Sequence, residues 1–241
     1  WQKRRFNWDV APEWVVQTSG TITTIKTIIQ AFSAPGDGVL IQPPVYSHFS
    51  GDVLLNGRRP VNAPLVRSKT GYQFDKDIFE RAVTPDTKLF ILSNPHNPTG
   101  NVWTEDELRS MGEVCVKHRI LVIADEIHQD LIINPMRRHV AFSSLDEAFA
   151  RLTFTCTSPS KSFNLPGLQS ANVIIPNAFL RSEFLRQYER NHLPLINTMG
   201  MIAAEAAYTH GEPWLAELLD YLRANHLRFS SALNGSNIGL D

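Results

Sequence analysis

One lysine of this sequence stands where a charged side chain is unusual. Lys161 follows an apolar stretch, 152–157, and is itself followed by the largely apolar residues 163–168. Lysine seldom lies in apolar surroundings without a partner, because its ammonium group is costly to remove from water. Its amine becomes a nucleophile toward carbonyl groups, with which it forms a Schiff base, when its pKa is depressed. The alternative interpretation is a surface lysine that follows a strand.

Asp125 and His128 form a second polar group, at the end of another apolar run. Asp125 closes the five apolar residues 120–124, so its carboxylate is predicted to be at least partly removed from water. An unpaired buried carboxylate is costly, and it therefore implies a cationic partner. That partner is either a ring-nitrogen cation of a ligand or a neighbouring arginine. His128 is either a catalytic group or a histidine with a structural role.

Three further polar segments also fall at predicted element ends. Residues 19–21, Ser-Gly-Thr, precede a predicted helix, whose free N–H groups and dipole would suit a phosphate, although an ordinary N-cap is the simpler interpretation. Asn94, Asn97 and Gly100 follow an apolar run and would serve equally well as turn formers. Tyr46 could stack on a flat ligand or pack into the core.

The elements that must position these groups are predicted from the spacing of apolar residues. Thr104 and Glu107 form a capping box at the start of a helix. Buried strands are predicted at 39–41, 89–92, 120–124, 152–157 and 171–175, an extended piece at 12–16, and further helices at 22–32, 49–55, 178–190, 196–208 and 213–233. Strands that alternate with helices predict an α/β fold, a three-layer αβα sandwich around a mostly parallel sheet. Ligands of such sheets bind at the carboxyl ends of the strands, where these polar groups fall.

Composition excludes several classes of partner. The 241 residues are 43% hydrophobic and carry a formal net charge of −1 with scattered Lys and Arg, so neither nucleic acid nor a membrane surface is an expected partner. No apolar run is long enough to span a bilayer, and no signal peptide opens the sequence, which predicts a cytoplasmic protein. Cys115 and Cys156 are expected to be buried thiols, and no metal site is predicted.

Taken together, the polar groups resemble a known family. Their motifs are Ser-Gly-Thr at 19–21, Pro-Val-Tyr at 44–46, Asn-Pro-His-Asn-Pro-Thr-Gly at 94–100, Asp-Glu-Ile-His at 125–128 and Ser-Pro-Ser-Lys at 158–161. In this order and spacing they resemble the fold type I pyridoxal-phosphate enzymes of the class I/II aminotransferase superfamily. The likeness runs through nearly the whole chain. It is strongest to the branch of the cystathionine β-lyases, or C–S lyases.

The resemblance implies roles for five side chains around the ring of pyridoxal 5′-phosphate. Lys161 would hold the cofactor as a Schiff base and later move the substrate α-proton. Asp125 would keep the pyridine nitrogen protonated, and Asn97 would hydrogen-bond the ring hydroxyl oxygen. Tyr46 would stack on the ring and is counted with Lys161 as catalytic. His128 takes the place where many aminotransferases have a tyrosine that contacts the ring hydroxyl.

The resemblance also implies how the phosphate is held. The backbone amides of Gly20, Thr21 and Ile22 would bind it, and Ser158 would add a hydroxyl. Many aminotransferases place a phosphate-binding arginine shortly after the lysine, whereas 162–176 contains no Arg or Lys. The phosphate must therefore be neutralised in another way or less completely.

The implied reaction is β-elimination from a cysteine S-conjugate such as cystathionine, which gives a thiol, pyruvate and ammonia. A pyridoxal-phosphate aminotransferase is the alternative, and a non-catalytic regulatory or binding module of the same fold is a further one. Residues 1–241 are expected to form the large cofactor domain of a homodimeric enzyme whose substrate is a small-molecule amino acid. Its last helix would lead to an absent C-terminal small domain, which carries the arginine for the substrate carboxylate.

Overall fold

A seven-stranded sheet forms the centre of the computed structural model, which describes residues 1–69, 71–194 and 196–233. Its strands, in spatial order, are β1 (Val15–Thr18), β9 (Ala171–Ile174), β8 (Thr153–Thr157), β7 (Leu121–Asp125), β6 (Thr87–Ser93), β2 (Gly38–Ile41) and β3 (Arg59–Asn62). Only β9 runs against its neighbours, so the sheet is mostly parallel, as predicted. A separate hairpin pairs β4 (Val66–Ser68) with β5 (Gly71–Gln73).

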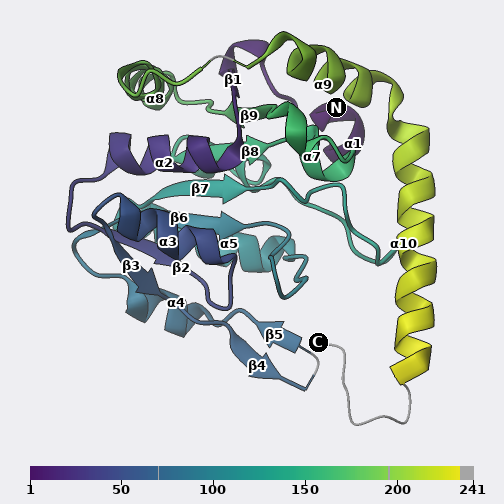
Figure 1. Ribbon diagram of the computed structural model, residues 1–241. Helices are drawn as coiled ribbons and strands as arrows, with labels where there is room; N and C mark the ends of the chain where they lie inside the picture. The colour runs from purple at the N-terminus through teal and green to yellow at the C-terminus, as the bar shows by residue number, and fades with distance from the viewer. Residues whose placement is uncertain (70, 195, 234–241) are drawn as a thin grey trace.

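The register of the central strands brings their carboxyl ends to one edge. Ser93 at the end of β6 lies opposite Asp125 at the end of β7, and Asp125 lies opposite Cys156 of β8. The arrows of β6 and β7 point toward the side on which the long helix α10 (Glu212–Leu233) stands (Figure 1). Polar residues that are far apart in sequence therefore meet at this edge.

Helices cover both faces of the sheet, which confirms the predicted three-layer αβα sandwich. On one face pack α2 (Thr21–Phe32), α3 (Ser47–Leu55) and α8 (Ala178–Arg190). On the other pack α4 (Lys76–Ala82), α5 (Glu105–His118) and α6 (Glu147–Ala150). Ile25, Ile28 and Ile29 of α2 are fully buried against the strands, which is what their spacing of three and four predicts.

Four further helices and three 3₁₀ turns complete the described part of the chain. They are α1 (Gln2–Phe6), α7 (Pro159–Ser162), α9 (Thr198–His210) and α10, together with the 3₁₀ turns Pro12–Trp14, Phe142–Ser144 and Pro166–Leu168. None of the helices in the described part of the chain combines the length and the apolar character that a membrane span requires.

Most predicted elements are present, and the differences are local. The capping box of Thr104 and Glu107 begins α5, and both cysteines are buried. The extended piece predicted at 12–16 is wrong at its start, because Pro12 favours a 3₁₀ turn and β1 begins only at Val15. Lys161 lies in the short helix α7 and not in a loop. Residues 234–241 of the predicted domain lie outside the described residues.

Candidate active site

One pocket of about 270 Å³ opens at the carboxyl ends of the central strands. All nine predicted site residues line it: Gly20, Thr21, Ile22, Tyr46, Asn97, Asp125, His128, Ser158 and Lys161. They come from the start of α2, the segment before α3, the loop after β6, the end of β7 and the turn after β8. The structure therefore brings these nine residues together, whereas Asn94 and Gly100, which the sequence also singled out, do not line this pocket. Their individual roles remain predictions.

Asp125 is a buried carboxylate without an ion pair in the described part of the chain. Its one hydrogen bond is accepted from the Ile127 N–H, at 3.3 Å. The pKa of Asp125 is raised to about 7, mainly by burial and also by the nearby negative charge of Glu126, while the Ile127 N–H and Lys161 act in the opposite direction. The alternative of a salt bridge to a neighbouring arginine is therefore wrong. The Asp125 carboxylate can therefore pair with a cationic group of a ligand in the pocket.

Glu126, beside it, fixes the end of β7 in place. Its fully buried carboxylate accepts hydrogen bonds from Asn94 Nδ2 at 3.2 Å, from the Phe142 N–H at 2.9 Å and from His139 Nε2 at 3.0 Å. Asn94 lies directly after β6, whereas His139 and Phe142 lie in the connection between β7 and β8. Because a buried carboxylate with three donors is held rigidly, the direction in which Asp125 leaves the strand is fixed too.

His128 and Asn97 present neutral polar groups to the pocket. Burial lowers the pKa of His128, and the positive charge of Lys161 lowers it further, so the imidazole is neutral at pH 7. The Asn97 N–H donates to Ser93 Oγ at 3.1 Å, which fixes the loop after β6. Tyr46 lies half-buried with its ring 5.8 Å from that of Phe49. Its aromatic face contributes to the wall of the pocket.

The start of α2 offers unused hydrogen-bond donors. Gly20 is its N-cap and supplies no side-chain cap, so the first N–H groups of the helix are not bound by a capping side chain. Thr21, only 8% exposed, has a buried hydroxyl without a partner among the described residues. The simpler interpretation of 19–21 as an ordinary Ser or Thr cap is therefore wrong. Free N–H groups at a helix start suit an anion.

Two serines near Lys161 differ in the hydrogen bonds that their hydroxyls make. Ser158 caps α7, accepting from the Ser160 N–H at 3.0 Å, and donates its own hydrogen to the Ser170 carbonyl at 2.6 Å. Ser170 is 5% exposed, and its hydroxyl has no partner among the described residues. Sequence reasoning missed Ser170 and its neighbour Gln169, which also lines the pocket. The signal was two polar residues directly before an apolar strand.

Among the described residues that line the pocket, Lys161 is the only lysine, and no arginine is present. A ligand with an anionic group would therefore be held by Lys161, by the α2 dipole and by neutral donors. A flat ring could lie along Tyr46, with a ring cation at Asp125. The arrangement suits a small, flat, anionic ligand that Lys161 can bond covalently.

Comparison with known proteins places the chain in a family. A family model described as "Aminotransferase class I and II" matches residues 3–240. The cystathionine beta-lyase PatB of Bacillus subtilis is 41% identical over 226 residues, which make up 93% of this chain and 58% of that relative. Protein MalY of Escherichia coli is 34% identical over 92% of this chain and 56% of MalY. Cystalysin from Treponema denticola, solved with pyridoxal 5′-phosphate, superposes with a TM-score of 0.95 at 31% identity, covering 98% of this chain and 60% of that one.

The chain belongs to the class I and II aminotransferase family. Cystathionine beta-lyases and C–S lyases are among its relatives, as are aminotransferases such as an N-succinyldiaminopimelate aminotransferase of Mycobacterium tuberculosis. The chain spans 58% of the length of PatB and 56% of that of MalY, and thus less than two thirds of either relative.

Proposed function

We propose that the pocket binds pyridoxal 5′-phosphate and that Lys161 holds it covalently. The observation that carries this proposal is the buried Asp125, which has no ion pair among the described residues and faces the same pocket as Lys161. A protonated ring nitrogen is the cation that this carboxylate lacks. Asn97 would donate to the ring hydroxyl oxygen, with the neutral His128 nearby, and Tyr46 would lie along the ring. Solved relatives are described as bound to the same cofactor, which supports the proposal.

The phosphate is proposed to lie at the start of α2. The backbone N–H groups of Gly20, Thr21 and Ile22 would bind it, and the free hydroxyls of Thr21 and Ser170 fit as further donors. Ser158 fits this role less well than the sequence suggested, because its hydrogen already bonds the Ser170 carbonyl. Hydroxyls and helix amides thus take the place of the missing arginine.

Ser170→Ala is expected to weaken the binding of pyridoxal phosphate about tenfold, because one hydrogen bond to a charged oxygen is lost. The free energy of unfolding without cofactor should not fall, since the hydroxyl has no protein partner among the described residues. Fluorescence titration with the cofactor and urea denaturation measure the two quantities. Ser143→Ala is the matched control: it removes the 2.8 Å bond to Thr155, so it should lower stability and leave binding unchanged. Equal cofactor affinities of Ser170→Ala and the wild type would contradict the assignment.

The chemistry of the site is derived from its own residues. When bound, the cofactor supplies a sink for the electron pair left on the substrate α-carbon. Lys161 takes the α-proton on its Nζ and later returns or releases it. Asp125 holds a proton at the ring nitrogen, which keeps the sink effective, and Asn97 orients the ring.

We infer that the reaction is β-elimination at a cysteine S-conjugate such as cystathionine, which with one water yields a thiol, pyruvate and ammonia. The identity to PatB and the C–S lyase structures among the relatives support this reaction. An aminotransferase is the second candidate, favoured by the aminotransferases among the relatives. Cystathionine given to the full-length protein should yield pyruvate at a steady rate. Amino transfer that depends on a keto acid, without pyruvate formation, would favour the aminotransferase. The absence of both activities would favour a binding module.

We also propose how this chain fits into a longer protein. Residues 1–241 would form the large domain of a longer homodimeric protein, in line with the 58% share of PatB that the chain spans. The arginine for the substrate carboxylate would lie outside this chain, and a cytoplasmic location remains a prediction. Gel filtration of the full-length protein tests the dimer.

A further inference from the structure

Asp130 is a buried carboxylate that the proposed chemistry does not use. It lies two residues after His128, is 3% exposed and is not among the residues that line the active-site pocket. Burial raises its pKa. A carboxylate so placed is costly unless several donors satisfy it, so its partners identify what it holds.

The donors to Asp130 come from two distant parts of the chain. Ser162 Oγ, in the residue that directly follows Lys161, donates to Asp130 Oδ2 at 2.9 Å. Trp1 Nε1 contacts the two carboxylate oxygens at 3.2 and 3.3 Å, and Arg5 Nε lies 3.5 Å from Oδ1. Asp130, in the segment after β7, therefore links helix α7, which carries Lys161, to α1.

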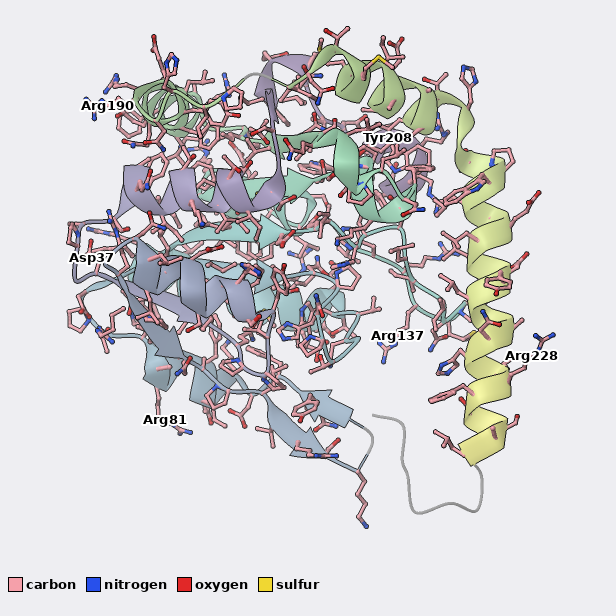
Figure 2. All side chains as sticks on the ribbon, viewed as in Figure 1. Asp37, Arg81, Arg137, Arg190, Tyr208 and Arg228 are labelled. Atoms are coloured by element: carbon pink, nitrogen blue, oxygen red, sulfur yellow. The ribbon has the colours of Figure 1, made fainter. Side chains whose placement is uncertain are left out.

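Aromatic rings pack together beside this link. The Trp1 ring lies 5.5 Å from that of Phe163 and 5.4 Å from that of Tyr208, which Figure 2 shows in α9 beside α1 and α7. The guanidinium groups of Arg4 and Arg5 lie over the Trp1 ring at 5.0 and 5.4 Å. These rings exclude water from the Asp130–Ser162 bond, which strengthens it.

Helix α7, which carries Lys161, needs contacts such as the Asp130–Ser162 bond to hold it in place. Helix α7 has only four residues, too few to be stable by itself, and Lys161 is the third of them. Ser158 fixes its first end by capping. Ser162, at its other end, is fully buried, and its hydroxyl bonds only Asp130 among the described residues. Lys161 thus lies between two fixed serines.

We propose that Asp130 is a positioning residue for Lys161, acting through the Ser162 hydroxyl. The proposal rests on the proposed covalent role of Lys161. The bond fixes the direction in which the lysine amine approaches the cofactor aldehyde. In the covalent step the neutral Nζ adds to the aldehyde carbon, a C=N bond forms, and the carbonyl oxygen leaves as one water. A small misplacement of a reacting group slows such a step strongly.

Ser162→Ala tests the proposal with a small change that keeps the backbone and the packing. Cofactor-free full-length protein is mixed with pyridoxal phosphate at several concentrations, and the near-visible absorbance of the covalent product is followed. The limiting rate at saturation is expected to fall at least tenfold, because it reports the placement of Lys161. The half-saturating concentration should change less than twofold, because the proposed phosphate and ring contacts lie elsewhere.

Three further variants separate positioning from general loosening. Asp130→Asn should also slow the limiting rate. The double variant with Ser162→Ala should show a smaller fold-decrease in that rate than the product of the two single fold-decreases, because both substitutions remove the same bond. Glu212→Gln is the matched control, since it removes the other ion pair of Arg5, at 3.3 Å, without touching Ser162, and its limiting rate should match the wild type.

The outcomes are distinct. An unchanged limiting rate in Ser162→Ala, or an equal fall in Glu212→Gln, would overturn the positioning role while leaving the proposed function intact. A change confined to the half-saturating concentration would also overturn it. Wild-type protein without any covalent product would instead refute the proposed function itself.

Discussion

The Lys161→Ala variant is expected to lose the near-visible absorbance band of the covalent cofactor and to lose elimination activity by at least 10³-fold. Lys161 is the only lysine that lines the pocket among the described residues, so no other amine there can replace it. The variant loses both the covalent bond and the base that moves the α-proton, and a positioned base alone contributes about 10²–10⁴-fold. Absorbance spectra with added cofactor and a pyruvate assay measure the two losses.

Two further substitutions separate charge from chemistry. Lys161→Arg keeps a positive charge but cannot condense with an aldehyde, because the guanidinium stays protonated, so it should behave like Lys161→Ala in both assays. Lys88→Ala is the matched control, since Lys88 is an exposed lysine whose one bond within the described residues is to the Pro85 carbonyl, at 3.2 Å. Retention of the band in Lys161→Ala, or its loss in Lys88→Ala, would contradict the assignment.

The location of the site could be predicted from sequence because strand ends are visible in apolar patterning. Asp125 directly follows a buried run, and the ends of parallel strands meet at one edge. Its burial could be predicted from the same run. Its lack of an arginine partner could not, because ion pairs depend on residues distant in sequence. That lack is what favours a ligand cation over a structural ion pair.

Hydrogen-bond assignments were harder to predict than positions. Ser158 was correctly placed at the pocket, but its hydrogen is bound to the Ser170 carbonyl, a contact that only the folded loop creates. Asp130 was overlooked for the same reason, since its donors Trp1 and Ser162 lie 129 and 32 residues away. The short helix α1 was also missed, because its five residues are too few to show a periodic pattern.

Replacing Asp125 by asparagine is expected to have opposite effects on activity and on stability. Activity should fall about 10²–10³-fold, because an amide does not hold a proton at the ring nitrogen as a carboxylate does. Without cofactor the same change should stabilise the protein at pH 8. There the native state contains a buried carboxylate whose pKa is raised to about 7, whereas asparagine is neutral at every pH.

The sign follows from proton binding. Between about pH 4 and pH 7 the native state keeps the Asp125 proton that the unfolded state has lost, so the native state binds more protons and stability falls as the pH rises. Above pH 7 the loss is complete and amounts to at most about 4 kcal/mol. Urea denaturation of cofactor-free Asp125→Asn and wild type should therefore give similar free energies of unfolding at pH 4 and a higher value for the variant at pH 8.

A second buried carboxylate provides the control. Asp52 is 1% exposed and pairs with Lys26 at 3.1 Å, so Asp52→Asn should lower the free energy of unfolding by about 1–3 kcal/mol at pH 8. Opposite signs at two buried carboxylates would show that Asp125 is kept for its ligand at a cost in stability. If Asp125→Asn were instead destabilising at pH 8, the carboxylate would have a partner within the protein, and its role as an unpaired acceptor for a ring cation would be refuted.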